Sequence, residues 1–222
     1  MRSEALIVVA HPDDESIFFA GLILSRPKTS WSVICVTDGN ADGHGQSRWE
    51  RFGQACRELG VDNYRCLKFP DKFEQRLPVD ELAAELSEVH GQEVFTHGIL
   101  GEYGHYHHQD VSYACHKVYS QECPLYSLAY NCYPDLTVSL SLDQWHKKAQ
   151  IFSEIYFSET HRFIKFLPVS FQENFARVAE EEAKAIYLHL TNQRPATKGD
   201  LIKYKAMYKY LDQYKINRIR IF

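Results

Sequence analysis

Two short segments of the chain carry side chains whose types and spacing suit metal-assisted hydrolysis. In the first, residues 10–15 (AHPDDE), His11 and Asp14 stand three positions apart and can face one point. An imidazole and a carboxylate form a mixed ligand pair suited to zinc or ferrous iron. Asp13 then stands beside the metal as a general base for a bound water, whose pKa zinc lowers to about 7. The alternative is a helix opened by acids, but this explains Asp14 and Glu15 and leaves His11 unexplained.

The second segment, residues 97–108, holds four of the chain's 11 histidines. His105 and His108 can share one face if a helix begins there, so His108 could complete a site with three protein ligands. Three protein ligands and a water are typical of a catalytic zinc site. The cluster could instead be a solvated surface loop. For His97 and His107 we expect a structural or solvated role.

The composition is that of an ordinary soluble globular protein. The chain has 222 residues, 45% of them hydrophobic and 24% charged, which excludes a disordered or fibrous protein. A chain of this length buries a core without help, so a metal site would serve chemistry rather than folding. The formal net charge of −4 gives no basic footprint, and we expect no nucleic-acid partner.

The compartment is predicted from cysteine usage and hydropathy. The six cysteines form no CxxC pair, which is typical of reduced thiols. The apolar run at residues 5–10 is too short for a signal peptide, and no segment is long enough to span a bilayer. The sequence therefore predicts a cytoplasmic protein without a transmembrane segment.

Short apolar runs alternate with helical patterns, which predicts an α/β fold with a Rossmann-like, doubly wound, mostly parallel sheet flanked by helices. Ligands of such sheets bind beyond the carboxyl ends of the strands, which is where the chemical side chains occur. We expect one domain over residues 1–222, with residues 165–222 as a divergent part made of helices packed on it. The expected strands are residues 5–10, 31–37, 64–69 and 93–97. The expected helices are residues 17–24, 47–59, 79–89, 109–120, 143–157, 175–190 and 199–214.

The two segments, with three further motifs, resemble the LmbE/PIG-L family of metal-dependent de-N-acetylases. The motifs are AHPDDE at 10–15, VTDG at 36–39, LGV at 59–61, FPD at 69–71 and THGxxGEYGHxxH at 96–108. They cover about the first half of the chain in the family's order. The resemblance implies hydrolysis of the acetamide of an N-acetylglucosamine-type sugar or glycoconjugate, which releases acetate and a free amine.

The resemblance also implies roles for single residues. It places a metal ion, Zn²⁺ with Fe²⁺ as the alternative, on His11, Asp14 and His108. Asp13 matches the general base. His105 matches the histidine that stabilises the tetrahedral oxyanion, and Tyr103 matches a mobile aromatic residue that polarises the carbonyl.

One position departs from the family pattern, and the substrate contacts are less specific. The family usually has HPDH, and here His107 replaces the acid of that motif. Asp110 could substitute for it. Arg48 falls near the family's substrate-contacting arginine, but a solvated arginine at a helix start is an equal alternative. Asp38 and Asp71 are candidate partners for sugar hydroxyls or simple loop residues.

Two other functions remain open. The same ligands would suit a metal-dependent phosphoesterase, although the sequence has no P-loop. A noncatalytic sugar-binding or scaffolding module with a vestigial site is the third hypothesis, and the presence of Asp13 and His105 beside the ligands speaks against it. A basic, tyrosine-rich stretch near the C-terminus could bind a partner or simply pack as a helix.

Overall fold

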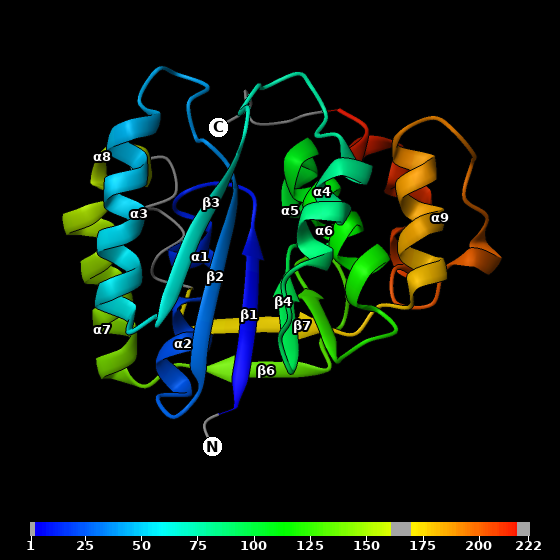
Figure 1. Cartoon of the computed structure of the whole chain (residues 1–222). Helices are drawn as coiled ribbons and strands as arrows, with labels where there is room; N and C mark the ends of the chain where they lie inside the picture. The colour runs from blue at the N-terminus through cyan, green and yellow to red at the C-terminus, as the bar shows by residue number, and fades with distance from the viewer. Residues whose placement is uncertain (1–2, 161–169, 217–222) are drawn as a thin grey trace. The chain divides into compact units, whose positions relative to one another are not determined.

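The structure is a computed structural model that describes residues 3–160 and 170–216 (Figure 1). The chain forms two compact units. The first unit contains residues 1–72 and 137–174, and the second contains residues 73–136 and 175–222.

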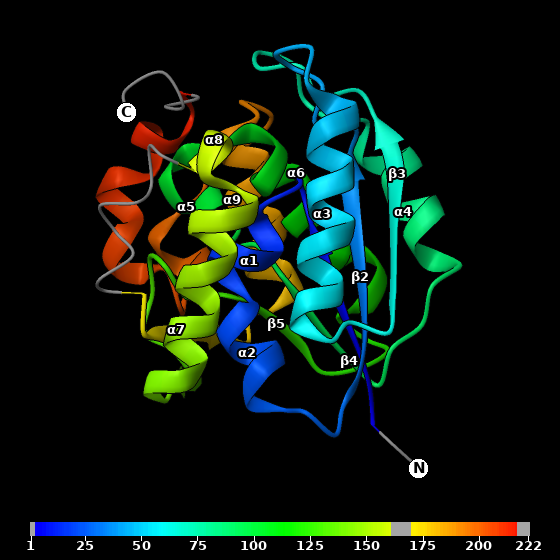
Figure 2. The same cartoon turned by 90° about the vertical axis from the view of Figure 1, so that its left-hand side faces the viewer.

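The first unit is built on three parallel strands, β1 (Glu4–Val9), β2 (Ser30–Thr37) and β3 (Asn63–Phe69). Strand β1 is buried at every position after its first residue, as expected for a strand covered on both faces. The helices of this unit are α1 (Asp14–Phe18), α2 (Ala20–Ser25), α3 (Gly45–Leu59) and α7 (Leu142–Gln150). Helix α2 packs against α3 and α7, and Figure 2 shows these three helices in one layer in front of the strands.

Helix α3 ends where the sequence predicts. Gly60 follows it with φ of 79°, a left-handed conformation that glycine adopts without steric cost. Helix α7 continues into a π-helical turn, η1 (Ile151–Ile155), and the short α8 (Phe157–Thr160) follows.

The second unit holds α4 (Val79–Ser87), β4 (Glu93–Thr96), α5 (Gly101–Gly104), α6 (Tyr106–Tyr119) and β5 (Leu125–Leu128). Later in the chain come α9 (Glu180–Leu190) and two 3-10 helices, η3 (Lys198–Asp200) and η4 (Lys205–Tyr214). Strands β4 and β5 are parallel. Helix α6 packs against both α4 and α9 and also contacts β4 (Figure 1).

The first unit has the strand order β3-β2-β1, and in the second unit β4 pairs with β5. The remaining strands are β6 (Leu136–Ser139) and β7 (Gln172–Ala176). Only the last strands add antiparallel pairing, because β7 runs antiparallel to β5. The predicted α/β class with a mostly parallel sheet is confirmed.

Several predicted elements differ from the structure. The helix expected at residues 17–24 is two helices, because Phe19 leaves helical geometry between α1 and α2. The helical prediction for 175–190 is wrong at its start: Phe175 and Ala176 belong to β7, and α9 begins at Glu180. The stretch 199–214 is 3-10 rather than α-helical. Residues 165–169 and 217–222 of the predicted helical part lie outside the described residues.

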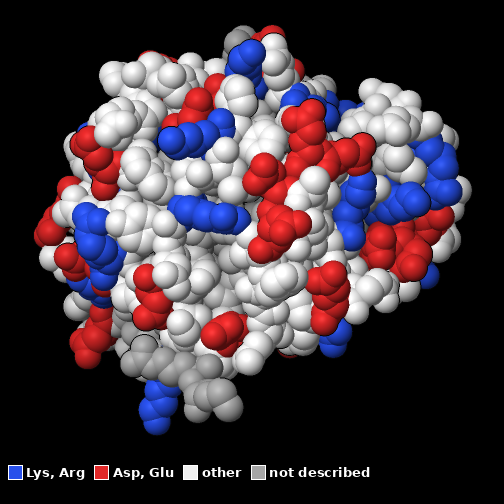
Figure 3. Space-filling model, viewed as in Figure 1, with Lys and Arg blue, Asp and Glu red and all other residues white. Residues whose placement is uncertain are grey.

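Charged side chains of both signs are interspersed on the face shown in Figure 3. The acidic side chains are therefore not concentrated in a single patch on that face. In the described ranges, no helix has the length and apolar character needed to cross a bilayer.

Candidate metal and active site

The turn that follows β1 holds its residues in an unusual backbone conformation. Asp13 has φ of 114°, which side chains other than glycine adopt at a cost of about 1 to 3 kcal/mol. The neighbouring carboxylate of Glu15 holds this turn, because its Oε2 accepts the Asp13 N–H at 3.0 Å. The other oxygen, Oε1, accepts the hydroxyls of Ser16 at 2.6 Å and Tyr156 at 2.8 Å. Glu15, Ser16 and Tyr156 thus fix the backbone from which the Asp13 carboxylate projects.

His11 and Asp14 come together as the sequence predicts. The His11 N–H donates to Asp14 Oδ2 at 2.8 Å, and the ring Nδ1 lies 3.4 Å from the same oxygen. The other ring nitrogen, Nε2, lies 3.7 Å from Asp71 Oδ1. Burial acts to lower the pKa of His11, but the carboxylates of Asp71 and Asp14 outweigh it and raise that pKa. A proton and a metal ion would compete for this imidazole.

Asp13 has the environment of a general base. Its carboxylate is buried, and burial raises its pKa to about 7 although the Arg48 guanidinium acts to lower it. Arg48 Nη2 lies 3.4 Å from Asp13 Oδ2 and donates to the Pro12 carbonyl at 2.9 Å. A carboxylate whose pKa lies near neutrality is suited to accept a proton at the working pH.

Arg48 and Asp38, two predicted substrate contacts, bind loops of the protein itself. Arg48 Nη1 donates to the Gly39 carbonyl at 3.1 Å. Asp38 Oδ1 accepts the N–H groups of Asn40 and Asp71, both at 3.0 Å. These bonds join the loops that follow β1, β2 and β3. Substrate binding by Arg48, Asp38 and Asp71 stays a prediction.

The segment after β4 is sharply kinked. Gly101, Glu102 and Gly104 have φ of 66°, 53° and 95°. His105 then caps α6: its Nδ1 accepts the His107 N–H at 3.2 Å. Because Nδ1 accepts, the proton of a neutral His105 ring lies on Nε2, which is then a donor.

His105 and His108 lie face to face. Their rings are parallel, with centroids 4.4 Å apart, and both are buried. The Tyr103 ring lies edge-on to both, at 6.2 Å from His105 and 5.8 Å from His108. The structure therefore brings these three predicted residues together around the first turn of α6.

The acid of the family pattern, which this chain lacks at position 107, is not supplied by Asp110. That carboxylate accepts from Arg76 at 2.6 Å, from the Leu77 N–H at 2.8 Å and from the Tyr187 hydroxyl at 2.8 Å. Nor does the His107 ring take the place of the acid, since its Nε2 lies 3.0 Å from the Gln75 carbonyl oxygen.

Glu102 is the residue that the sequence prediction missed. Its Oε2 lies 2.5 Å from His108 Nδ1 and 3.3 Å from His97 Nδ1. Burial acts to raise the pKa of Glu102, but these two imidazoles outweigh it and lower that pKa to about 2. The only sequence signal was the pair of glycines around it, which permit a backbone with positive φ.

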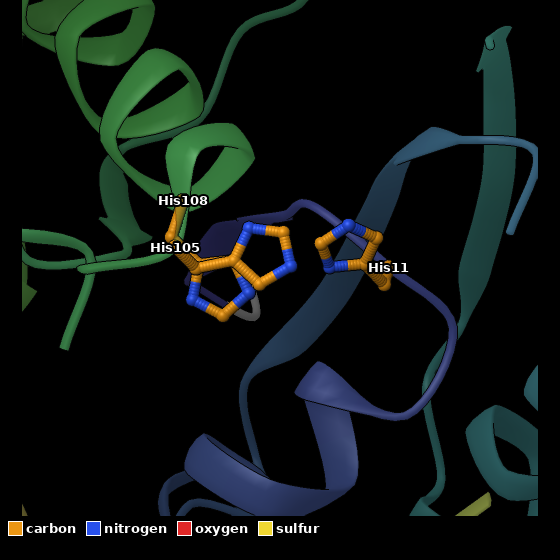
Figure 4. A group of neighbouring side chains, drawn as sticks. All are labelled: His11, His105 and His108. Carbon is orange, nitrogen blue, oxygen red and sulfur yellow. The ribbon is translucent and has the colours of Figure 1, made fainter. Parts of the chain in front are cut away.

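Among the described residues, ligand atoms suited to a metal ion are offered in the first unit by His11, Asp14 and Asp71, and in the second unit by His97, His105, His107 and His108. Figure 4 shows from which elements three of these side chains extend: His105 and His108 from the start of α6, and His11 from the loop after β1. All the donors are imidazole nitrogens or carboxylate oxygens, which suit zinc and ferrous iron. The predicted ligand set takes His11 and Asp14 from the first unit and His108 from the second, and it stays a prediction.

Comparison with known proteins places the sequence motifs in a family. The family model described as PIG-L, GlcNAc-PI de-N-acetylase, matches residues 6–119. The N-acetylglucosaminyl-phosphatidylinositol de-N-acetylase of Bos taurus is 35% identical over 88 residues, which are 36% of this chain and 35% of the relative. The chain spans between 31% and 56% of the length of the first curated relatives it matches.

Solved structures share the fold at low sequence identity. The N,N'-diacetylchitobiose deacetylase of Pyrococcus horikoshii superposes with a TM-score of 0.64 at 19% identity, over 80% of this chain and 84% of that one. The 4-carboxy-2-hydroxymuconate hydratase GalB of Pseudomonas putida superposes with a TM-score of 0.55 at 16% identity, over 80% of this chain and 98% of that one. The fold is therefore shared by proteins of different named activities, whereas the family model matches the half of the chain that carries the motifs. On that match, the chain belongs to the PIG-L (GlcNAc-PI de-N-acetylase) family.

Proposed function

We propose that this protein is a metal-dependent de-N-acetylase that hydrolyses the acetamide of an N-acetylglucosamine-type sugar or glycoconjugate. The observation that carries the proposal is the environment of Asp13, a buried carboxylate next to the His11 and Asp14 ligand pair with a pKa raised to about 7. The names of the family and of the relatives from Bos taurus and Pyrococcus horikoshii support an N-acetylglucosamine-type substrate.

His11, Asp14 and His108 would hold the metal, which we propose to be zinc. A bound zinc ion would supply Lewis acidity toward the amide carbonyl and would lower the pKa of the attacking water. The imidazole and carboxylate donors of these three residues match that ion's usual ligands.

The remaining steps belong to side chains of the chain itself. The Asp13 carboxylate accepts a proton from the water while the water oxygen forms a bond to the acetamide carbon. His105 Nε2–H, left as a donor by the His107 contact at Nδ1, stabilises the oxyanion. Tyr103 donates its hydroxyl proton in a hydrogen bond to the same oxygen. The C–N bond then breaks, the amine nitrogen takes up the proton, and acetate leaves.

Acetate release tests the proposal. The purified chain is incubated with N-acetylglucosaminyl-phosphatidylinositol, N,N'-diacetylchitobiose and N-acetylglucosamine, with and without a chelator. We expect acetate from at least one substrate, loss of release with the chelator and its recovery with Zn²⁺. Absence of chelator-sensitive release from all three substrates would refute the proposal, and phosphate release from phosphomonoesters would favour the phosphoesterase.

Two variants test the role of Asp13. Asp13→Asn should lower kcat by about 10²- to 10⁴-fold while the metal content measured by mass spectrometry stays at the wild-type level. Asp42→Asn is the matched control, because Asp42 is an exposed acid whose carboxylate accepts the His44 N–H at 3.1 Å. Equal activity of the two variants would exclude Asp13 as the base.

A further inference from the structure

We propose that Glu102 is a positioning residue that fixes the imidazole of His108 in the tautomer able to bind a metal. The inference rests on the proposed function in one respect, that His108 is a metal ligand. The Glu102 carboxylate reaches the ring from six positions earlier in the chain.

Both oxygens of the Glu102 carboxylate are engaged, and its side chain is fully buried. Oε1 accepts the Gly98 N–H at 2.8 Å, and Oε2 lies 2.5 Å from His108 Nδ1. A carboxylate can only accept, so His108 Nδ1 must carry a proton. The lone pair of a neutral His108 ring then lies on Nε2, which becomes the nitrogen available to a metal.

The His108 ring is also held in place by its neighbours. His97 stacks on it at a centroid distance of 3.9 Å, and His105 stacks on it at 4.4 Å. His108 is fully buried, so its ring has little room to turn. Stacking fixes the plane of the ring, and the contact with Glu102 fixes which nitrogen carries the proton.

The backbone around Glu102 is built to deliver this side chain. Glu102 itself has φ of 53°, a conformation that costs a residue other than glycine about 1 to 3 kcal/mol. Gly101 before it has φ of 66°, and a Cβ there would lie 2.9 Å from Cγ of Gln109. A strained residue that persists inside a tightly packed turn is one whose side-chain contacts hold it there.

The same contacts explain how the site works with a histidine at position 107. In the family pattern the acid stands directly before the last histidine, but here the His107 ring faces the Gln75 carbonyl. Glu102 supplies a carboxylate to His108 from the other side of the turn. Carboxylates that orient metal-binding histidines typically raise metal affinity by about 10- to 100-fold.

The variant Glu102→Gln should change the tautomer of His108, and this change can be measured. Glutamine offers one oxygen and one NH₂ group. The Gly98 N–H is a fixed backbone donor and claims the oxygen, so the NH₂ group faces His108 Nδ1. That nitrogen can then pair only as an acceptor, and the proton of His108 moves to Nε2.

Glu182→Gln is the matched control. Glu182 is another buried glutamate of the second unit, and its oxygens accept the N–H groups of Ile202, Lys203 and Tyr204. The chemical change is the same, and any general loss of stability is shared. None of these contacts involves His108.

Two measurements test the inference. In ¹⁵N-histidine NMR of the metal-free protein, His108 should be protonated at Nδ1 in the wild type and in Glu182→Gln, and at Nε2 in Glu102→Gln. In Zn²⁺ titrations against a competing chelator, Glu102→Gln should bind about 10- to 100-fold more weakly than the control.

The outcomes separate this inference from the proposed function. Wild-type His108 protonated at Nε2, or equal Zn²⁺ affinity of Glu102→Gln and Glu182→Gln, would overturn the role of Glu102. If Glu102→Gln does not fold, the tautomer of His108 in the wild type is enough to confirm or overturn the role of Glu102. If the wild type binds no Zn²⁺, the proposed function fails, while the tautomer still tests what Glu102 does to the ring.

Discussion

The neighbouring lysines Lys147 and Lys148 on α7 should differ sharply in their contribution to stability. Lys148 is 1% exposed and donates to Glu173 Oε1 at 2.8 Å. Glu173 is 4% exposed and also accepts the N–H groups of Gly21 and Leu22 at 2.7 Å, so it caps the start of α2. Lys147 pairs with Glu58, and both of these side chains are partly exposed.

Lys148→Met would remove one partner of a buried ion pair and leave the Glu173 charge without its cation. Breaking such a pair costs about 3 to 5 kcal/mol. For a chain of this size each kcal/mol lowers Tm by about 2 to 4 °C, so the midpoint should fall by about 10 °C. Lys147→Met should leave Tm close to the wild-type value, because solvent screens an exposed pair.

Thermal and urea unfolding followed by circular dichroism measures both variants under one set of conditions. Lys148→Met combined with Glu173→Leu should not recover the lost stability, because the N–H groups of Gly21 and Leu22 then lose their acceptor. Similar Tm values for Lys147→Met and Lys148→Met would refute the reasoning. Full recovery in the double variant would show that the cap on α2 contributes nothing.

Three further predictions follow from buried polar groups and from the metal. Glu15→Ala removes the acceptor of the Asp13 N–H, so kcat in the acetate assay should fall by about 10²-fold with a smaller change in KM. An unchanged kcat would contradict the role of Glu15 in the turn. His116 is fully buried, and burial lowers its pKa from 6.5, so the unfolded chain takes up its proton first as pH falls. The free energy of unfolding should therefore drop below pH 6.5 by up to about 1.4 kcal/mol per pH unit. His116→Gln should flatten this dependence in urea titrations, whereas the exposed His90→Gln should keep it. Zn²⁺ at a free concentration of 100 times its Kd should raise the free energy of unfolding by about 2.7 kcal/mol, with reversal by a chelator, and a Tm that ignores Zn²⁺ would contradict binding to the folded chain.

The sequence predicts correctly those buried strands that consist of an unbroken run of apolar residues. Strand β2 (Ser30–Thr37) lies within one position of its predicted start, because its apolar residues are bounded by Asp38 and Gly39. Strands β5 and β6 have only four residues each, too few to show a period. Strand β7 (QENFA) is mixed in polarity, so its sequence shows no strand pattern. Pairing of its last two residues with β5 overrides the helical pattern that the sequence predicts from residue 175.

The site residues divide in a similar way. His11 and Asp14 were predictable because a contact between residues three positions apart depends only on a local turn. The contact of Glu102 with His108 depends on a residue with positive φ, and nothing in the side-chain pattern signals that conformation. The orientation of His107 toward Gln75 likewise depends on a loop from a different part of the sequence.

The position of a carboxylate in space matters more to an imidazole than its position in a motif. A ring nitrogen responds to whichever acceptor lies within hydrogen-bond reach, and Glu102 meets that condition for His108 although it stands six positions away. If Glu102 has the proposed role, the HPDH pattern is one way among others to place an acid against His108. By this reasoning, replacing His107 with Asp should leave the tautomer of His108 unchanged, because Glu102 already holds Nδ1–H. A switch of that tautomer in His107→Asp, read by ¹⁵N NMR, would show that the acid at 107 and not Glu102 governs the ring.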